Sequence, residues 1–202
     1  MIAIIDYGMG NLRSVQKAIE RTGAKTLITQ QARDILEAKG VILPGVGAMP
    51  PAMEKLQALN LIGAIREAIN TNKPFLGICL GYQLLFEKSS EGGEVKGLGI
   101  LPGTVERFNA SLKVPHIGWN QIKINNPLCP LFNRIKDQAN VYFCHSYYAK
   151  PKDSNIVIGE TDYGKTFAAA IHRGSLFGVQ FHPEKSQTVG LQILSNFTKI
   201  AK

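Results

Sequence analysis

The segment Pro74–Gln83, with the sequence PFLGICLGYQ, is the most informative part of the chain. Its apolar start, Phe75–Ile78, is typical of a short buried strand, and the residues that follow carry a helical pattern. Cys79 lies where the strand must turn into the helix, between Gly77 and Gly81. A Gly-x-Cys-x-Gly sequence at such a junction indicates a nucleophile elbow with sulfur in place of the serine oxygen. We therefore expect a strained backbone at Cys79, with glycines that let the strand and the helix approach closely.

The same turn places backbone groups around the sulfur. The N-terminus of the following helix favours a thiolate, because its free N–H groups carry partial positive charge. The N–H of Leu80 is expected to face the oxyanion that forms when the sulfur attacks a carbonyl carbon. Most isolated cysteines are buried structural residues, but two flanking glycines at a strand–helix junction favour a nucleophile.

Short apolar runs separated by helical patterns continue on the N-terminal side of the elbow. Strands are expected at Ile2–Ile5, Lys25–Thr29 and Val41–Leu43. Helices are expected at Asn11–Arg21, capped by Asn11, at 52–71 with a break near Asn60, and at Tyr82–Glu87. Strands without polar alternation, joined by helices, indicate a parallel sheet that is buried on both faces.

After Gly97 the pattern changes to strand-like segments with short connections, which favours antiparallel strands. The segments are 104–108, 121–124, 141–148, 156–160, 166–172 and 175–181. Ser186 is expected to cap a last helix, whose apolar face holds Val189, Ile193, Phe197 and Ile200. The sequence thus predicts a single α/β domain over residues 1–202 with three layers. A central, mostly parallel sheet carries helices on both faces and antiparallel additions in the C-terminal half.

The composition excludes several classes of protein. Among 202 residues, 45% are hydrophobic and 19% are charged, which is incompatible with a disordered chain. No apolar run approaches the roughly 20 residues that span a bilayer. The apolar start Met1–Ile5 ends at Asp6 and has no basic segment before it, so it is interpreted as a strand and not as a signal peptide. Three cysteines do not make a disulfide framework in a chain of this length, which favours the reducing cytoplasm.

The net charge is 23 − 15 = +8. A basic chain can bind nucleic acid, an anionic membrane or an anionic protein. No two Lys or Arg residues are adjacent, and the one regular stripe is Arg13, Lys17, Arg21 and Lys25. Residues four apart share a helix face, and a solvated face is the more common reason for such a stripe than a nucleic-acid site. The charge by itself leaves the class of partner open.

A cysteine nucleophile needs a base within hydrogen-bond reach and a third group that orients the base. Of the four histidines, only His182 stands beside a carboxylate at the end of a predicted strand, in the segment 178–184, GVQFHPE. Residues two apart in an extended chain project to the same side, so Glu184 can bind one imidazole nitrogen and leave the other to face Cys79. The other three histidines are expected to be strand residues with ordinary hydrogen bonds: His116, His145 and His172.

A second glycine-rich turn, LPGVGA at 43–48, follows a predicted strand. The backbone N–H groups of such a turn can bind an oxyanion or a carboxylate. Beside a cysteine elbow, this turn is the expected second wall of the site.

The segment Gly159–Thr166 matches the phosphate-binding pattern G-x-x-x-x-G-K-[ST]. A phosphate-binding loop surrounds the phosphates with backbone N–H groups, yet Glu160 and Asp162 place two negative charges there. A helix should also follow, but the apolar run after Thr166 is short and ends in a turn at 172–174. Nucleotide binding is therefore disfavoured, and a phosphate- or nucleic-acid-binding module remains as the non-enzymatic alternative.

The elbow at 77–83 and the triplet His182-Pro183-Glu184 resemble the class I (triad) glutamine amidotransferases. Further segments resemble, within that family, the glutaminase subunits of imidazole glycerol phosphate synthase. These are 6–14 (DYGMGNLRS), 44–48 (PGVGA), 114–120 (VPHIGWN), 142–148 (YFCHSYY) and 178–186 (GVQFHPEKS). The match runs from Met1 to the last helix.

The resemblance implies hydrolysis of L-glutamine to glutamate and ammonia through a thioester on Cys79, with His182 moving the proton and Glu184 orienting His182. It implies oxyanion donors at the backbone of Val46 and Leu80. The implied substrate contacts are Gly47 and Gln83, with Ser146 and Tyr147 near the α-carboxylate. No metal or organic cofactor is implied.

The resemblance also implies a heterodimer with a cyclase subunit of the (β/α)8 barrel fold. That partner would take up the ammonia and make imidazole glycerol phosphate and an aminoimidazole carboxamide ribotide in histidine biosynthesis. The implied interface residues are Asn11, Trp119, Asn120 and Lys185. Part of the basic excess, including Arg13 and Lys185, is expected to face acidic groups of the cyclase. The alternative within the family is a paralogous subunit that feeds another synthase, such as a sugar-amination enzyme.

Three positions depart from the usual family pattern. This chain has Tyr82 where Met is usual, Met49 where an aromatic residue is common, and Cys144 where Val is common. None of them removes a catalytic atom, but Tyr82 is expected to lie close enough to Cys79 to influence glutamine binding.

Overall fold

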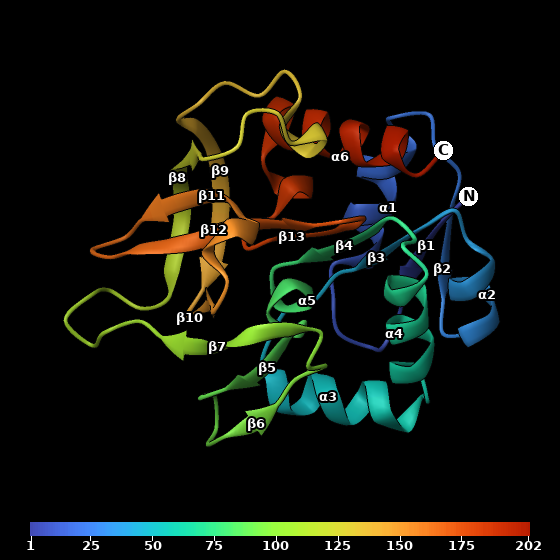
Figure 1. Ribbon diagram of the computed structural model, residues 1–202, viewed down its shortest axis with the longest axis horizontal. Helices are drawn as coiled ribbons and strands as arrows, with labels where there is room; N and C mark the ends of the chain where they lie inside the picture. The colour runs from blue at the N-terminus through green and yellow to red at the C-terminus, as the bar shows by residue number, and fades with distance from the viewer.

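The structure is a computed structural model that describes all residues from Met1 to Lys202. A nine-stranded mixed sheet in the order β2-β1-β3-β4-β13-β12-β11-β8-β9 runs through its centre (Figure 1). The first five strands of that order are parallel: β2 (Thr26–Thr29), β1 (Ile2–Ile5), β3 (Gly40–Leu43), β4 (Phe75–Ile78) and β13 (Leu176–Val179). The remaining four are antiparallel additions: β12 (Thr166–Arg173), β11 (Val157–Asp162), β8 (His116–Ile124) and β9 (Ala139–His145). The predicted fold class is confirmed.

Helices cover both faces of the parallel half (Figure 1). One face carries α1 (Leu12–Glu20) and α6 (Gln187–Ile200), and the other carries α2 (Ala32–Glu37), α3 (Met49–Ala58) and α4 (Ile62–Asn70). Neighbouring strand residues alternate between two cores: Ile4 packs with α1 and α6, whereas Ile5 packs with α3 and α4. This burial on both sides explains why β1, β3, β4 and β13 carry no polar side chain. No helix reaches the length and apolarity that crossing a membrane requires.

A second sheet of four strands lies beside the first, in the order β10-β7-β5-β6 (Figure 1). Its strands are β10 (Tyr147–Pro151), β7 (Leu101–Arg107), β5 (Phe86–Ser89) and β6 (Val95–Lys96). The predicted helix Tyr82–Glu87 is wrong, since α5 (Leu80–Gln83) is a single turn. The carbonyls of Leu84 and Leu85 accept hydrogen bonds from Leu98 (2.8 Å) and Ile100 (2.9 Å), so the chain enters a sheet instead of a longer helix.

The helical region at 52–71 is divided as the sequence predicts. Asn60, with a φ of 53°, lies in the break between α3 and α4. The sequence did not predict α2 or three short 3-10 turns: η1 (Pro130–Phe132), η2 (Ser154–Ile156) and η3 (Pro183–Lys185).

The two predicted helix caps are wrong, although the helices begin where expected. The Asn11 side chain makes no capping hydrogen bond to α1. The Ser186 hydroxyl instead donates to the His182 carbonyl at 2.7 Å and accepts from the Tyr142 N–H at 2.9 Å. Because both partners lie outside α6, Ser186 connects His182 to β9 and does not cap α6.

The segment Gly159–Thr166 forms the end of a β-hairpin between β11 and β12. Asp162 Oδ1 accepts a hydrogen bond from the Gly164 N–H at 3.2 Å, and Lys165 Nζ donates to the Tyr148 hydroxyl at 2.7 Å. A phosphate-binding loop must be followed by a helix, whereas this turn is followed by a strand. The helix that a phosphate-binding loop requires is therefore absent after this segment.

Candidate active site

Cys79 follows β4 in a conformation that few residues adopt. Its φ of 53° and ψ of −107° lie outside the regions that L-residues favour. The Cys79 N–H donates to the Val179 carbonyl at 2.8 Å, and the Cys79 carbonyl accepts from the N–H groups of Tyr82 and Gln83 at 3.1 Å each. These bonds hold the strained elbow that the sequence predicts.

Glycine is required on both sides of this elbow. A Cβ on Gly77 would lie 2.8 Å from the Gly81 carbonyl oxygen, and a Cβ on Gly81 would lie 1.8 Å from the Leu43 carbonyl oxygen of β3. Real Cβ atoms do not approach backbone atoms so closely. The turn and the neighbouring strand therefore pack backbone against backbone around Cys79.

The helix after the sulfur is shorter than expected. Because α5 has four residues, few peptide dipoles align with it, and the expected support of a thiolate by a helix N-terminus is correspondingly small. Charge support for the sulfur must come mainly from the side chains around it.

His182 follows β13 and contacts both side chains that the sequence assigns to it. Its Nδ1 lies 2.9 Å from Glu184 Oε1, and the two side chains are 3% and 1% exposed. The ring lines the same cavity as the Cys79 side chain. The His182 N–H donates to the Tyr142 carbonyl at 2.9 Å, so both the backbone and the ring are held in place.

The surroundings of His182 favour its charged form. Burial opposes a charged imidazole, but hydrogen bonds and charge from Cys79 and Glu184 outweigh it and raise the pKa of His182 to about 10. The second carboxylate oxygen of Glu184 is buried without a hydrogen-bond partner. The positive charge of the His182 imidazolium is thus the main compensation for the negative charge of the buried Glu184 carboxylate. This dependence couples the charges of Cys79, His182 and Glu184.

A cavity of about 240 Å³ opens in front of the sulfur. It is lined by Cys79 and His182 and by all the residues that the sequence assigns to the oxyanion and the substrate: Val46, Gly47, Leu80, Gln83, Ser146 and Tyr147. Glu184 is not in the lining, because it lies behind His182. The elements that meet here are the turns after β3, β4 and β13 and the junction of β9 with β10, all far apart in the sequence.

Three further residues at this site were not expected from the sequence. The Gln180 amide donates to Cys79 Sγ at 3.8 Å, the Glu91 carboxylate lines the cavity and accepts from the Met49 N–H at 2.8 Å, and the buried His145 lines the cavity. Partial burial raises the pKa of Glu91. Gln180 could have been found from its place two residues before His182, on the same strand side. Glu91 carries no local signal.

The glycine-rich turn after β3 reaches the elbow through its backbone. The Leu80 N–H, the expected oxyanion donor, donates to the Gly45 carbonyl over a long 3.4 Å. Val46 is 40% exposed, and Gly47 adopts a φ of 95°. In this arrangement, the Leu80 N–H is bound to the Gly45 carbonyl and is therefore not free to donate to an oxyanion.

The four expected interface residues do not behave alike. Trp119 is 48% exposed and contacts Tyr142 edge to face, and Lys185 lies over the same tyrosine ring with Nζ 5.7 Å from its centre. Asn11 precedes α1, which contacts the η3 turn that carries Lys185. Asn120 points inward, since its amide donates to the Asp162 carbonyl at 2.8 Å.

A family model described as "Glutamine amidotransferase class-I" matches residues 3–201. The chain belongs to this family. The fold, the family and the enzyme class predicted from the sequence are thereby confirmed.

The curated relatives of this amidotransferase carry a more specific name. "Imidazole glycerol phosphate synthase subunit HisH" of Moorella thermoacetica is 54% identical over 201 residues, covering 100% of this chain and 95% of the relative. The subunit of the same name from Bacillus cytotoxicus is 48% identical over 203 residues, covering 100% and 96%. These relatives confirm the predicted resemblance to a subunit of imidazole glycerol phosphate synthase.

Solved structures support the fold independently. A structure titled "Crystal structure of glutamine amidotransferase" matches with a TM-score of 0.78 at 17% identity, covering 100% of this chain and 99% of that one. PurLQS from Thermotoga maritima matches with a TM-score of 0.75 at 19% identity, covering 100% and 98%. At such low identity, these likenesses show the three-layer fold alone.

Two of the family departures have a structural explanation. Tyr82 does not line the cavity, as it is fully buried and donates to the Ala168 carbonyl at 3.3 Å. It packs on Gly178, where a Cβ would lie 2.4 Å from the tyrosine ring. Cys144 is exposed and lines the cavity, and its carbonyl accepts from the Cys79 thiol at 3.8 Å.

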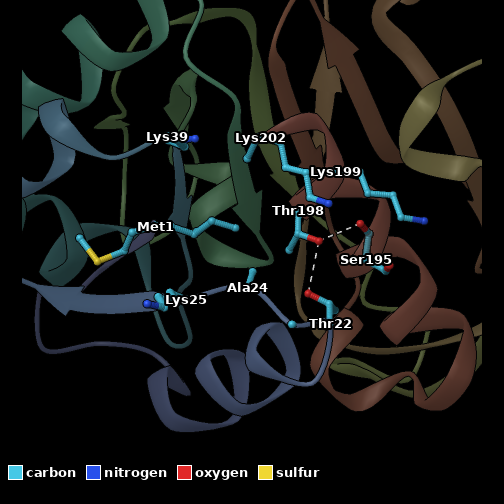
Figure 2. Close-up of a pocket in the computed structure, with 12 residues that line it drawn as sticks. Met1, Thr22, Ala24, Lys25, Lys39, Ser195, Thr198, Lys199 and Lys202 are labelled. Atoms are coloured by element: carbon cyan, nitrogen blue, oxygen red, sulfur yellow. Dashed lines mark hydrogen bonds between the residues drawn. The ribbon is translucent and has the colours of Figure 1, made fainter.

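This amidotransferase has a second cavity, of about 270 Å³, at the other end of the parallel strands (Figure 2). Thr22 and Thr198 hydrogen-bond each other there at 3.2 Å. The charged side chains of its lining are all basic: Lys25, Lys39, Lys199 and Lys202. It offers no cysteine, histidine or carboxylate side chain, so it lacks the groups for acid–base or nucleophilic chemistry.

Proposed function

We propose that this chain hydrolyses L-glutamine to glutamate and ammonia through a thioester on Cys79. The observation that carries the proposal is the strained elbow at Cys79, in contact with a buried His182 whose Nδ1 is 2.9 Å from Glu184. This arrangement provides a nucleophile, a proton carrier and an orienting carboxylate in one cavity.

Each proton transfer in the proposed reaction follows from the charges of Cys79, His182 and Glu184. The sulfur, with its proton on His182, attacks the side-chain amide carbon of glutamine, and the carbonyl oxygen becomes an oxyanion. His182 then gives its proton to the leaving nitrogen, the C–N bond breaks, and ammonia departs from a thioester. A water molecule attacks the thioester while His182 takes its proton, and glutamate leaves as the sulfur recovers its starting state.

Backbone N–H groups of Val46 and Leu80 are the proposed oxyanion donors. Because the Gly45 carbonyl already accepts from Leu80 at 3.4 Å, this long contact must be released when the oxyanion forms. We assign substrate contacts to Gly47, Gln83, Ser146 and Tyr147, as the resemblance implies. The partly buried Glu91 suits the α-ammonium group of the substrate, since it is the only carboxylate in the cavity lining.

The proposed assembly is a heterodimer with a (β/α)8 cyclase subunit, to which the ammonia passes within imidazole glycerol phosphate synthase in the cytoplasm. The proposed contact residues are Asn11, Trp119 and Lys185. Asn120 is proposed at the same interface, although its amide also binds the Asp162 carbonyl. The exposed apolar side chains Ile117 (58%), Trp119 (48%) and Val46 (40%) support a protein partner on this face.

The chemical proposal is tested by Cys79→Ser, with Cys129→Ser as the matched control. Cys129 is also free and buried, but it is outside the cavity. We expect Cys79→Ser to lose glutaminase activity while its thermal midpoint stays near that of the wild type, and Cys129→Ser to retain activity. Full activity of Cys79→Ser would overturn the mechanism.

The partner proposal is tested by co-purification with a (β/α)8 cyclase, followed by glutaminase assays with and without the cyclase ligand. We expect stimulation by the liganded cyclase, and an affinity that falls as salt rises because Arg13 and Lys185 face acidic groups. An unstimulated glutaminase would leave the chemistry in place and point to a paralogous synthase as the recipient of ammonia.

A further inference from the structure

Two buried histidines lie side by side on one face of the antiparallel half of the sheet, next to the cavity. His116 of β8 and His145 of β9 are directly opposite each other in the strand register, and they are 3% and 6% exposed. Nδ1 of His116 lies 3.0 Å from Nε2 of His145. His145 also lines the cavity that holds Cys79, so the pair connects the site to the interior of the antiparallel half.

The hydrogen-bond partners fix the protonation of both rings. Nδ1 of His145 lies 2.8 Å from the Tyr147 carbonyl, which can only accept, so that nitrogen carries a hydrogen. Burial lowers the pKa of His145 to about 3 and that of His116 to about 4, so both rings are neutral at neutral pH. Nε2 of His145 therefore accepts from the Nδ1–H of His116, and Nε2 of His116 is left as an acceptor.

Asn120 supplies the donor at the outer end. Its Nδ2 lies 3.3 Å from Nε2 of His116 and donates to the Asp162 carbonyl at 2.8 Å. Its Oδ1 accepts from the Gln121 N–H at 2.8 Å. With a carbonyl on one side and an N–H on the other, the amide has only one orientation that satisfies both.

At the inner end, the chain continues to the sulfur. The Tyr147 carbonyl also accepts from Gln83 Nε2 at 2.8 Å, and the same nitrogen donates to Gln180 Oε1 at 3.0 Å. Gln180 Nε2 then donates to Cys79 Sγ at 3.8 Å. Every link from Asn120 to the sulfur is thus a hydrogen bond between partners that are buried or half-buried.

We propose that His116 and His145 are positioning residues, which hold the Tyr147 carbonyl and the Gln83 amide in place and couple them to the orientation of Asn120. The inference rests on the proposed glutaminase function. A partner that takes the Asn120 amide as its own ligand would remove the outer donor of the chain and loosen the wall of the cavity opposite Cys79.

A purely structural role is the competing explanation, because His116 stacks on Tyr163 (4.0 Å between ring centres) and on Phe143 (4.8 Å). His116→Phe keeps this packing and removes both hydrogen bonds. His145→Gln keeps an acceptor near the Nε2 position but loses the donor to Tyr147, whereas His145→Asn keeps that donor. His172→Gln is the matched control, since His172 also binds a backbone carbonyl (Gly174, 2.7 Å) but lies outside the cavity.

Glutamine hydrolysis is measured for these variants in complex with the cyclase subunit, with the thermal midpoint of each. Loss of one hydrogen bond predicts about a tenfold fall in kcat/KM for His145→Gln, mainly through KM, and a smaller fall for His145→Asn. Asn120→Ala should lower kcat/KM less in the His116→Phe background than in the wild type, because the His116 acceptor is already gone. Additive effects of these two substitutions would overturn the coupling.

A spectroscopic measurement separates positioning from packing. In 15N NMR at neutral pH, both rings should carry their hydrogen on Nδ1, and His116→Phe should shift the Nε2 signal of His145. An Nε2–H form of His145, or wild-type kcat/KM for His145→Gln, would overturn the inference. Loss of activity in Cys79→Ser would still support the proposed function in that case. If the wild-type complex does not hydrolyse glutamine, the proposed function itself fails.

Discussion

The two ends of the parallel strands carry cavities of similar size and opposite character. At the carboxyl ends, about 240 Å³ is lined by a strained cysteine, two histidines and one carboxylate. At the amino ends, about 270 Å³ is lined by four lysines and no acidic, histidine or cysteine side chain (Figure 2). Cavity volume therefore does not distinguish them, whereas the chemistry of the lining does.

The difference has a local cause. At their carboxyl ends, the parallel strands run into tight turns, such as those after Leu43 and Ile78. These turns bring backbone N–H groups together at one edge of the sheet, which is where parallel α/β sheets generally bind ligands. At the amino side, the chain arrives from helix ends, where cations complement the free carbonyls. Lys199 in the last turn of α6 is an example. For Lys199, helix stability thus accounts for the basic charge at this end.

The largest effect is expected from Glu184→Gln at the carboxyl end. The substitution removes the carboxylate that helps to raise the pKa of His182 to about 10, so the imidazolium loses support and the ring loses its orientation. We expect kcat for glutamine hydrolysis to fall by about 10²- to 10⁴-fold and the pKa of His182 to move down in an NMR titration. A kcat within threefold of the wild type would show that Glu184 does not orient His182.

The same variant gives a pH-dependent difference in stability. Because the folded pKa of His182 is raised to about 10 above an unfolded value near 6.5, its charged form stabilises the wild type fully below pH ~6.5. This stabilisation is lost as the pH rises through about 10. The free energy of unfolding of the wild type should therefore exceed that of Glu184→Gln most near pH 6 and least near pH 10, as measured by urea titration.

The second effect concerns the packing behind the cysteine. Gly178→Ala places a Cβ 2.4 Å from the Tyr82 ring, and such overpacking costs about 1–3 kcal/mol. Tyr82→Leu vacates the ring position, so the double variant should be less destabilised than the sum of the two single variants. Urea unfolding measures all four forms. Gly63→Ala serves as a control, because a Cβ there meets no atom within 4 Å; purely additive costs would argue against this contact.

Much of this end of the molecule could be predicted from local sequence. The elbow, its glycines and the pair His182 and Glu184 depend on neighbours within a few residues, and local spacing shows them. The helix expected at Tyr82–Glu87 was wrong because the Leu84 and Leu85 carbonyls bind residues 98–101, which no local pattern reveals.

The residues missed at the site share the same limitation. Glu91 reaches the cavity from the segment between β5 and β6, and His145 reaches it because β8 pairs with β9 in one register. Asn120 was expected near the partner interface, and local spacing gave no sign that its amide also binds His116 and the Asp162 carbonyl. Such assignments depend on which strands pair, and pairing between distant segments is not encoded by local spacing.

A smaller effect is expected at the hairpin that matches a phosphate-binding pattern. Lys165→Ala removes the hydrogen bond to the Tyr148 hydroxyl and the contact of Nζ with its ring at 4.9 Å. The side chain is exposed, so we expect a change of no more than about 0.5 kcal/mol in the free energy of unfolding. ATP titration by calorimetry should show no heat of binding for either form. ATP binding to the wild type that is lost in Lys165→Ala would show that this turn is a nucleotide site.

The smallest effect is expected at the lysine-lined cavity, where Lys25→Gln and Lys39→Gln are combined. Since no carboxylate side chain faces these ammonium groups in the cavity, their removal relieves repulsion and should raise the thermal midpoint slightly at low salt. The gain should disappear at high salt, where exposed charges are screened. Glutaminase kcat/KM should stay within about twofold of the wild type, because surface substitutions far from a site rarely change it. A fall in kcat/KM without a fall in thermal midpoint would mean that the two ends of the strands communicate.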